Sequence, residues 1–262
     1  EPNKAKSLIL EAINLSTEAN LDRLSVEGMN LFGGFLSLRA SYDSAISEYD
    51  EALLISEKIE YHVGFSEALT GMGDVYWRKG DLKKAQEYHE RNMEFSESIN
   101  NTAGIAGSYN SLGNINNDLA EYTKAMEYYT LAAKTFEELG DERSTSIALT
   151  NVGVIHQRLE NYDKAISYYQ TSDSIFKKMK FHRGTAFISG RLATVYKNLG
   201  EYEISLEYSQ KALEGFEKIG SPAAIAEIKH NIGNLYWDQE KYNEALPYYL
   251  EARAINMEIG DT

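Results

Sequence analysis

The amino-acid sequence predicts an all-α solenoid built from antiparallel helix pairs. A small residue recurs every 40 positions, at Gly33, Gly73, Gly113, Gly153, Ala193 and Gly233. A second small residue follows each of them by twelve positions, at Ala45, Ala85, Ala125, Ala165, Ser205 and Ala245. No insertion or deletion interrupts this register across six copies. Internal repetition at such a period is typical of solenoids, in which each repeat packs on its neighbours.

Each repeat reads as two helices joined by short turns. In the fourth repeat Ala148, Val152, Ile155 and Leu159 form an apolar stripe with helical spacing on the first helix. The pattern predicts helices over residues 22–39 and 42–59, and again at each 40-residue step. Gly140 followed by Asp141 is one of several pairs that place a helix-ending glycine before an N-cap residue.

The predicted organisation is a single solenoid over residues 1–262. Its repeats run over residues 22–61, 62–101, 102–141, 142–181, 182–221 and 222–262, and residues 1–20 read as the second helix of a truncated repeat. The fifth repeat departs most from the pattern, with Ala193 and Ser209 at two packing positions, and we expect it to be the loosest. Because the chain stops at a Gly-Asp pair like the one that opens another helix at 140–141, we expect more chain after Thr262 and weak end-to-end self-association of this fragment.

Composition narrows the classes of function. The net charge is −14, from 26 Lys and Arg against 40 Asp and Glu, which argues against nucleic acid or an anionic membrane surface as the partner. No cysteine is present, the five histidines show no metal-ligand spacing, and no pair of carboxylates lies in an apolar setting suited to acid catalysis. We therefore expect no enzyme activity, no cofactor, no metal and no membrane insertion. We expect the cytoplasm as the compartment, or the periplasm if a signal segment has been removed.

The repeat pattern resembles the tetratricopeptide repeat, a helix-turn-helix unit, over practically the whole chain. The match rests on a Leu-Gly type pair followed by alanine and an aromatic, as in Leu112-Gly113 with Ala125 and Tyr129. The proline that usually ends the second helix is absent, so each repeat extends to 40 residues. Such long repeats are similar to those of Pins/LGN-like scaffolds, kinesin light chains and bacterial Rap-type sensors. The resemblance implies a right-handed superhelix.

The resemblance also implies that the first helix of each repeat lines the concave side of the superhelix. The inward positions lie three residues before the glycine position and one and four residues after it, which places them on one helix face. They carry many amides, and asparagine can both donate to and accept from a peptide group. The candidate peptide-binding groove comprises Asn110, Asn114, Asn117, Asn151, Gln157, Arg191, Asn234, Trp77 and Trp237, flanked by Arg78, Arg158 and Lys197.

Two hypotheses for the function remain open. The first is a non-enzymatic scaffold module that binds a protein or peptide in the groove. The second is the sensory input domain of a larger bacterial signalling protein, such as a kinase, cyclase or transcription regulator. Asn114, Asn151 and Arg191 match the family's carboxylate clamp, but Asn110 and Phe187 replace its two lysines, so we expect an uncharged or basic ligand.

Overall fold

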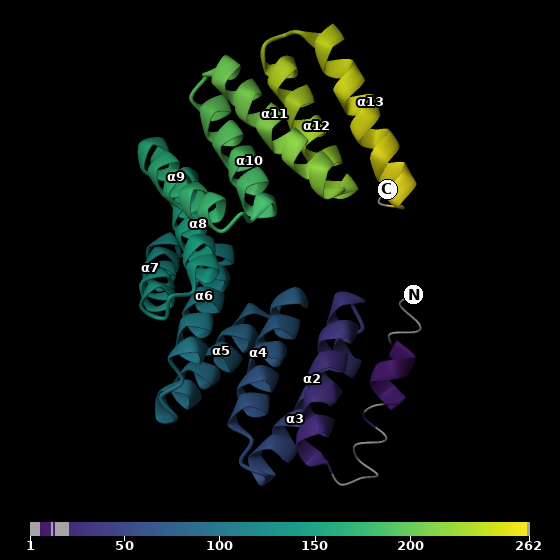
Figure 1. The fold of residues 1–262 in the computed structure, drawn as a ribbon, viewed down its shortest axis with the longest axis vertical. Coiled ribbons are helices and arrows are strands. Elements are labelled where there is room, and N and C mark those ends of the chain that lie inside the picture. The colour runs from purple at the N-terminus through teal and green to yellow at the C-terminus, as the bar shows by residue number, and fades with distance from the viewer. Residues whose placement is uncertain (1–5, 12, 14–20, 261–262) are drawn as a thin grey trace. The chain divides into compact units, whose positions relative to one another are not determined.

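A computed structural model describes residues 6–11, 13 and 21–260 of the chain. From residue 22 onwards the described residues form α-helices joined by tight turns, with no β-strand among them (Figure 1). The helices are α2 (Asp22–Leu38), α3 (Tyr42–Lys58), α4 (His62–Arg78), α5 (Leu82–Ser98), α6 (Thr102–Asp118), α7 (Tyr122–Glu138), α8 (Glu142–Arg158), α9 (Tyr162–Lys178), α10 (His182–Asn198), α11 (Tyr202–Ile219), α12 (Pro222–Asp238) and α13 (Tyr242–Ile259). These bounds confirm the predicted all-α class and the 40-residue step. The helix expected over residues 1–20 lies mostly outside the described residues, although 6–11 and 13 are helical.

The turns repeat as regularly as the helices do. A residue with positive φ follows each helix at a step of 20 positions, at Ala40, Glu60, Gly80, Asn100, Ala120, Gly140, Glu160, Lys180, Gly200, Gly220, Glu240 and Gly260. This left-handed residue reverses the chain and lets the next helix run antiparallel. Asp141 then caps α8 through its carboxylate, which accepts a hydrogen bond from the Ser144 N–H at 3.0 Å. The predicted glycine and N-cap pairs thus stand at helix boundaries.

The chain divides into two compact units, residues 1–135 and 136–262. In the first, each of helices α2 to α6 packs on the helix that follows it, and α2 also touches α4. In the second, the same sequential packing runs from α8 to α13. Within each unit, consecutive helices therefore lie side by side in chain order (Figure 1).

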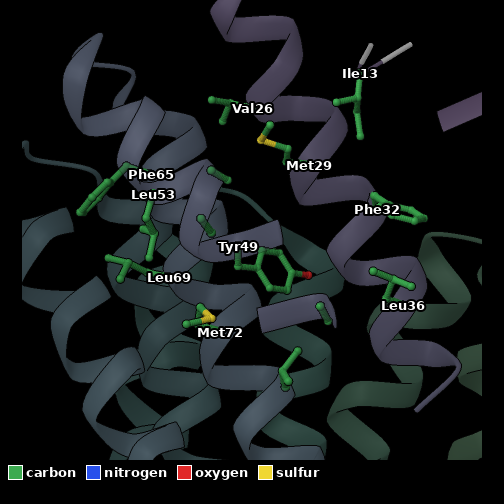
Figure 2. Packing of buried hydrophobic residues seen from close by; sticks show 14 residues of the cluster. Ile13, Val26, Met29, Phe32, Leu36, Tyr49, Leu53, Phe65, Leu69 and Met72 are labelled. Carbon is green, nitrogen blue, oxygen red and sulfur yellow. The ribbon is translucent and has the colours of Figure 1, made fainter. Parts of the chain in front are cut away.

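A buried aromatic ring from the second helix packs against the glycine of the first helix. In the first unit Tyr49 projects from α3 among Phe32, Leu36 and Met72 (Figure 2). A Cβ atom at Gly33 on α2 would lie 2.7 Å from this ring, and one at Gly71 on α4 would lie 2.2 Å from it. Glycine at both places is what allows three helices to meet around one tyrosine.

The fifth repeat lacks this ring. Ala193 and Ser209 occupy the positions of the glycine and the tyrosine, and beside them lies a cavity of about 50 Å³. The hydroxyl of Ser205 donates to the carbonyl of Ala193 at 2.8 Å, which partly compensates the lost packing. A small cavity thus lies between α10, α11 and α12, and the looser packing expected of this repeat stays a prediction.

Candidate functional site on the first-helix face

The structure shows what holds the amides of the predicted groove. We call the inward positions of α2, α4, α6, α8, α10 and α12 the first-helix face. On it, the Oδ1 atoms of Asn114 and Asn234 each accept a hydrogen bond at 2.8 Å from a tyrosine hydroxyl of the following helix, Tyr129 and Tyr249 respectively. Gln157 accepts similarly from Tyr169 at 2.7 Å. The acceptor ends of these amides are engaged within the fold, which fixes their orientation and leaves the NH₂ groups as the ends that can serve a ligand.

Asn117 differs from these three amides. Its Nδ2 donates to Asp118 at 3.3 Å, while its Oδ1 is buried and has no hydrogen-bond partner among the described residues. A buried acceptor without a donor is costly and needs an explanation, because its hydration is lost without compensation. Asn110 and Asn151 are half-buried on the same face of their own helices.

Two of the predicted ligand-contacting side chains instead tie neighbouring repeats together. The Trp77 indole N–H donates to Asp118 Oδ2 at 2.7 Å, joining α4 to α6 in the first unit. Lys197 pairs with Asp238 at 2.9 Å, joining α10 to α12 in the second. The two pairs occupy equivalent register positions, 120 residues apart. These contacts give both side chains a role in packing between repeats.

Of the remaining predicted residues, Trp237, Arg78 and Arg158 lie near helix ends, whereas Arg191 lies in the middle of α10. Trp237 is 56 % exposed, and its ring meets Tyr242 edge-on at 4.8 Å across the α12–α13 turn. Arg78 and Arg158 are exposed at the last residues of α4 and α8. Arg191 is half-buried on α10, with its guanidinium 4.8 Å from the ring centre of Phe187.

A hollow of the second unit lies nearer the N-terminal ends of its first helices, away from most of the predicted residues. Its volume is about 560 Å³, and it is lined by Arg143, Ile147, Thr150, Asn151, Phe176, Phe181, Arg183, Gly184, Phe187, Phe216, Ala224 and Glu227. We call it the arginine–phenylalanine pocket. Of the residues predicted from the sequence, Asn151 alone lines it.

One position of the 40-residue repeat distinguishes the repeats that form this pocket. Six residues before the glycine position the repeats carry Glu27, Glu67, Gly107, Ile147, Phe187 and Glu227. The fourth and fifth repeats thus place large apolar side chains where other repeats place glutamate or glycine. The sequence reasoning considered three other rows of the same helices, one turn or more further along, and so missed this one.

Comparison with known proteins identifies the family. The tetratricopeptide repeat model matches residues 25–98, 104–178 and 184–258, so the chain belongs to the tetratricopeptide repeat family. A comparison with curated proteins found no match. Among the described residues, no helix is long and apolar enough to cross a bilayer, and no cluster of three or more His, Asp or Glu side chains is arranged to hold a metal ion.

Several solved structures share the fold. The apo form of RapI is 15% identical with a TM-score of 0.71, covering 98% of this chain and 100% of that one. The Rap conjugation gene regulator of plasmid pLS20, solved in complex with a peptide, is 15% identical with a TM-score of 0.67, covering 97% of this chain and 76% of that one. The tetratricopeptide repeat sensor protein PH0952 from Pyrococcus horikoshii, a signal transduction ATPase with numerous domains, is 19% identical with a TM-score of 0.71 and covers 100% of this chain and 45% of that one. At identities this low, the similarity shows a common fold alone.

Proposed function

We propose that the chain is a non-enzymatic protein- or peptide-binding scaffold module, and that each unit contacts the ligand through its own part of the first-helix face. The observation that carries the proposal is the fixed orientation of the amides on that face. Each tyrosine hydroxyl occupies the oxygen of its amide, so the NH₂ groups of Asn114, Gln157 and Asn234 are pre-oriented donors. Such donors suit the carbonyl groups of a peptide backbone, and pre-orientation lowers the entropy lost on binding.

A peptide group presents one C=O that can accept from such a donor. The similar fold of a Rap regulator solved in complex with a peptide is in keeping with this proposal.

The test removes the NH₂ donors of two amides and keeps the fold. In Asn114→Asp and Asn234→Asp the carboxylate still accepts the tyrosine hydroxyl but offers no N–H to a ligand. Peptides selected by the wild-type protein from a random displayed library should bind the double variant at least tenfold more weakly, which corresponds to about 1.4 kcal/mol. Tyr129→Phe and Tyr249→Phe are the matched comparison, since they keep the NH₂ donors and remove the hydrogen bonds that orient them.

Equal binding by the double aspartate variant would remove the first-helix face from consideration. Weaker binding by the phenylalanine variants shows that the tyrosine bonds act by orienting the amides if the unfolding temperature is unchanged, and that they act through stability if it falls. Thermal unfolding of all variants distinguishes these cases, because a loss of affinity without a change in unfolding temperature belongs to the ligand contact.

A second candidate function is a sensory input domain. It is favoured by the similarity to the tetratricopeptide repeat sensor protein of Pyrococcus horikoshii, where this chain spans 45% of that chain's length. In this case the parent protein carries an output domain whose activity changes when the peptide binds. Sequencing the full gene and assaying any kinase, cyclase or DNA-binding domain with and without the selected peptides separates the two functions.

A further inference from the structure

The arginine–phenylalanine pocket combines an apolar floor with a basic rim. Phe176, Phe181 and Phe216 form the floor, and the side chains of Ile147 and Phe187 form two walls. The two wall residues are 40 and 44 % exposed, which is costly for large apolar side chains that no neighbouring repeat covers. A hollow of about 560 Å³ with this lining falls within the range of ligand-binding pockets.

The charge at this pocket is opposite to that of the chain. Arg143 and Arg183 stand at the rim, Arg191 follows Phe187 by one turn, and Glu227 is the acidic residue among those that line the pocket. None of the three guanidinium groups forms a salt bridge with a carboxylate of the described residues. The neighbouring acid Glu142 pairs with Lys178 instead. A protein with a net charge of −14 therefore presents here a local cluster of three arginines, with Asp141 beside Arg143 and Glu227 in the lining as the acidic residues near them.

The aromatic rings hold two of these arginines in place. The guanidinium carbon of Arg143 lies 4.8 Å from the ring centre of Phe181, and that of Arg191 lies 4.8 Å from that of Phe187. A guanidinium held against a ring can still donate from its edges, and its planar fork matches the two oxygens of a carboxylate. The pocket thus provides apolar surface and carboxylate donors within one hollow.

We propose that this pocket recognises an acidic segment of a partner protein. One large apolar side chain of the segment packs against the phenylalanine floor, and adjacent Asp or Glu side chains of the segment pair with Arg143 and Arg183. The inference rests on the proposed peptide-binding function and names the chemistry of the ligand. It replaces the sequence-based expectation of an uncharged or basic ligand. That expectation took the charge of the whole chain as a guide, whereas recognition depends on the charge where the ligand lies.

The register supports a dedicated role. The first two repeats carry Glu27 and Glu67 where the fourth and fifth have Ile147 and Phe187. An acidic ligand would be repelled by those two glutamates, which favours the fourth and fifth repeats as its place along the chain. Phe187→Glu gives the fifth repeat the residue of the first, second and sixth repeats at an exposed site and should leave the fold intact.

The experiment uses a displayed library of random twelve-residue peptides with blocked C-termini, so that a terminal carboxylate cannot contribute. The wild-type protein should select sequences with an aromatic or leucine residue flanked by Asp or Glu. The selected peptides, labelled for fluorescence anisotropy, should bind Phe187→Glu and Arg143→Gln/Arg183→Gln at least tenfold more weakly. Arg253→Gln, an exposed arginine on α13 away from the pocket, is the charge-matched control and should bind normally. Raising the salt concentration should weaken binding to the wild-type protein and have less effect on the double glutamine variant.

Three outcomes overturn the proposal. The selected sequences show no acidic and apolar pattern, or they bind Phe187→Glu as well as the wild type, or Arg253→Gln weakens binding as much as the pocket variants do. If peptides lose affinity for the Asn114→Asp/Asn234→Asp variant and keep it for the pocket variants, the scaffold function stands and the pocket proposal fails. If the library yields no binding peptide at all, both fail.

Discussion

The close approach of Gly113 to Tyr129 makes a quantitative prediction about repeat packing. A Cβ atom at Gly113 would lie 2.6 Å from both Cδ1 and Cε1 of the tyrosine ring. The ring cannot easily move aside, because it is 3 % exposed and its hydroxyl is bonded to Asn114. The variants to compare are Gly113→Ala, Tyr129→Ser and the two together. The double variant reproduces the Ala193 and Ser209 pair that the fifth repeat already carries.

The expected magnitudes follow from these contacts. Overpacking by one methyl group costs about 1–3 kcal/mol, while replacing a helical glycine by alanine gains about 1 kcal/mol. Tyr129→Ser removes a buried ring and should cost about 3–5 kcal/mol, by analogy with other large-to-small substitutions. In that background the alanine at position 113 meets no ring and contributes its helix propensity alone. The double variant should therefore be more stable than the sum of the singles by about 2 kcal/mol.

The assay is urea unfolding followed by far-UV circular dichroism, with the midpoint and slope analysed together. Gly107→Ala on the same helix is the matched control, since a Cβ there meets nothing within 4 Å. It should stabilise by about 1 kcal/mol, so the difference between the two alanine variants isolates the overpacking. Because repeat arrays can unfold in stages, hydrogen exchange in α6 and α7 should report the same order of stability. Additive effects, or a Gly113→Ala variant as stable as Gly107→Ala, would refute the close packing of ring and glycine.

Three further predictions concern titration and association. Burial, and to a lesser degree the charge of Lys164, lowers the pKa of His156, so this residue's contribution to stability is complete above pH of about 6.5 and is lost as the pH falls. His156→Tyr restores the tyrosine of the fifth and sixth repeats and should reduce the fall in urea midpoint on acidification. Changing the exposed His182 to Gln should not reduce it. Burial raises the pKa of Tyr49 and of Tyr169 to about 12, so their contribution to stability is complete below pH of about 10 and is lost as the pH rises through 12. Because the chain has 19 tyrosines, the measurement is the difference in tyrosinate absorbance between the wild type and Tyr49→Phe/Tyr169→Phe, which should follow the loss of helical signal; a difference that rises near pH of about 10 while the helical signal is intact would contradict it. Leu246 on α13 is 56 % exposed, whereas its equivalents in earlier repeats are half-buried, so sedimentation should show weak concentration-dependent association that Leu246→Glu abolishes.

The fold was predictable because the same packing problem is posed six times. Five of the six repeats fit a ring such as Tyr169 against a glycine such as Gly153, and any change in spacing would separate them. The 40-residue period therefore encodes both the helix bounds and the residues that meet. The turns were less predictable, because residues such as Glu60 and Lys180 adopt positive φ without the glycine that signals it. The geometry of the two flanking helices imposes that conformation from outside the turn.

The contacts of the candidate site residues could not be predicted from the sequence. The rows of amides were visible in the sequence, but the tyrosine hydroxyls that occupy the oxygens of Asn114 and Asn234 come from the following helix. Lys197 was expected to face a ligand and instead pairs with Asp238 of the next first helix. Contacts of this kind depend on side chains some 12 to 41 positions away, and a pattern read along one helix does not contain them.

In a chain whose packing is fixed by repetition, the residues that break the register carry the most information about function. A repeated tyrosine or alanine is explained by the neighbour it touches, so its presence says nothing about a ligand. Phe187 stands where three other repeats have glutamate, remains 44 % exposed, and lines a hollow rimmed by Arg143 and Arg183. Stability alone would favour glutamate here, because an exposed ring gains little from burial while a charged side chain is well hydrated. The exception is accounted for if the ring is covered when a partner binds, and this is why the pocket offers a sharper test of function than the amide rows around it.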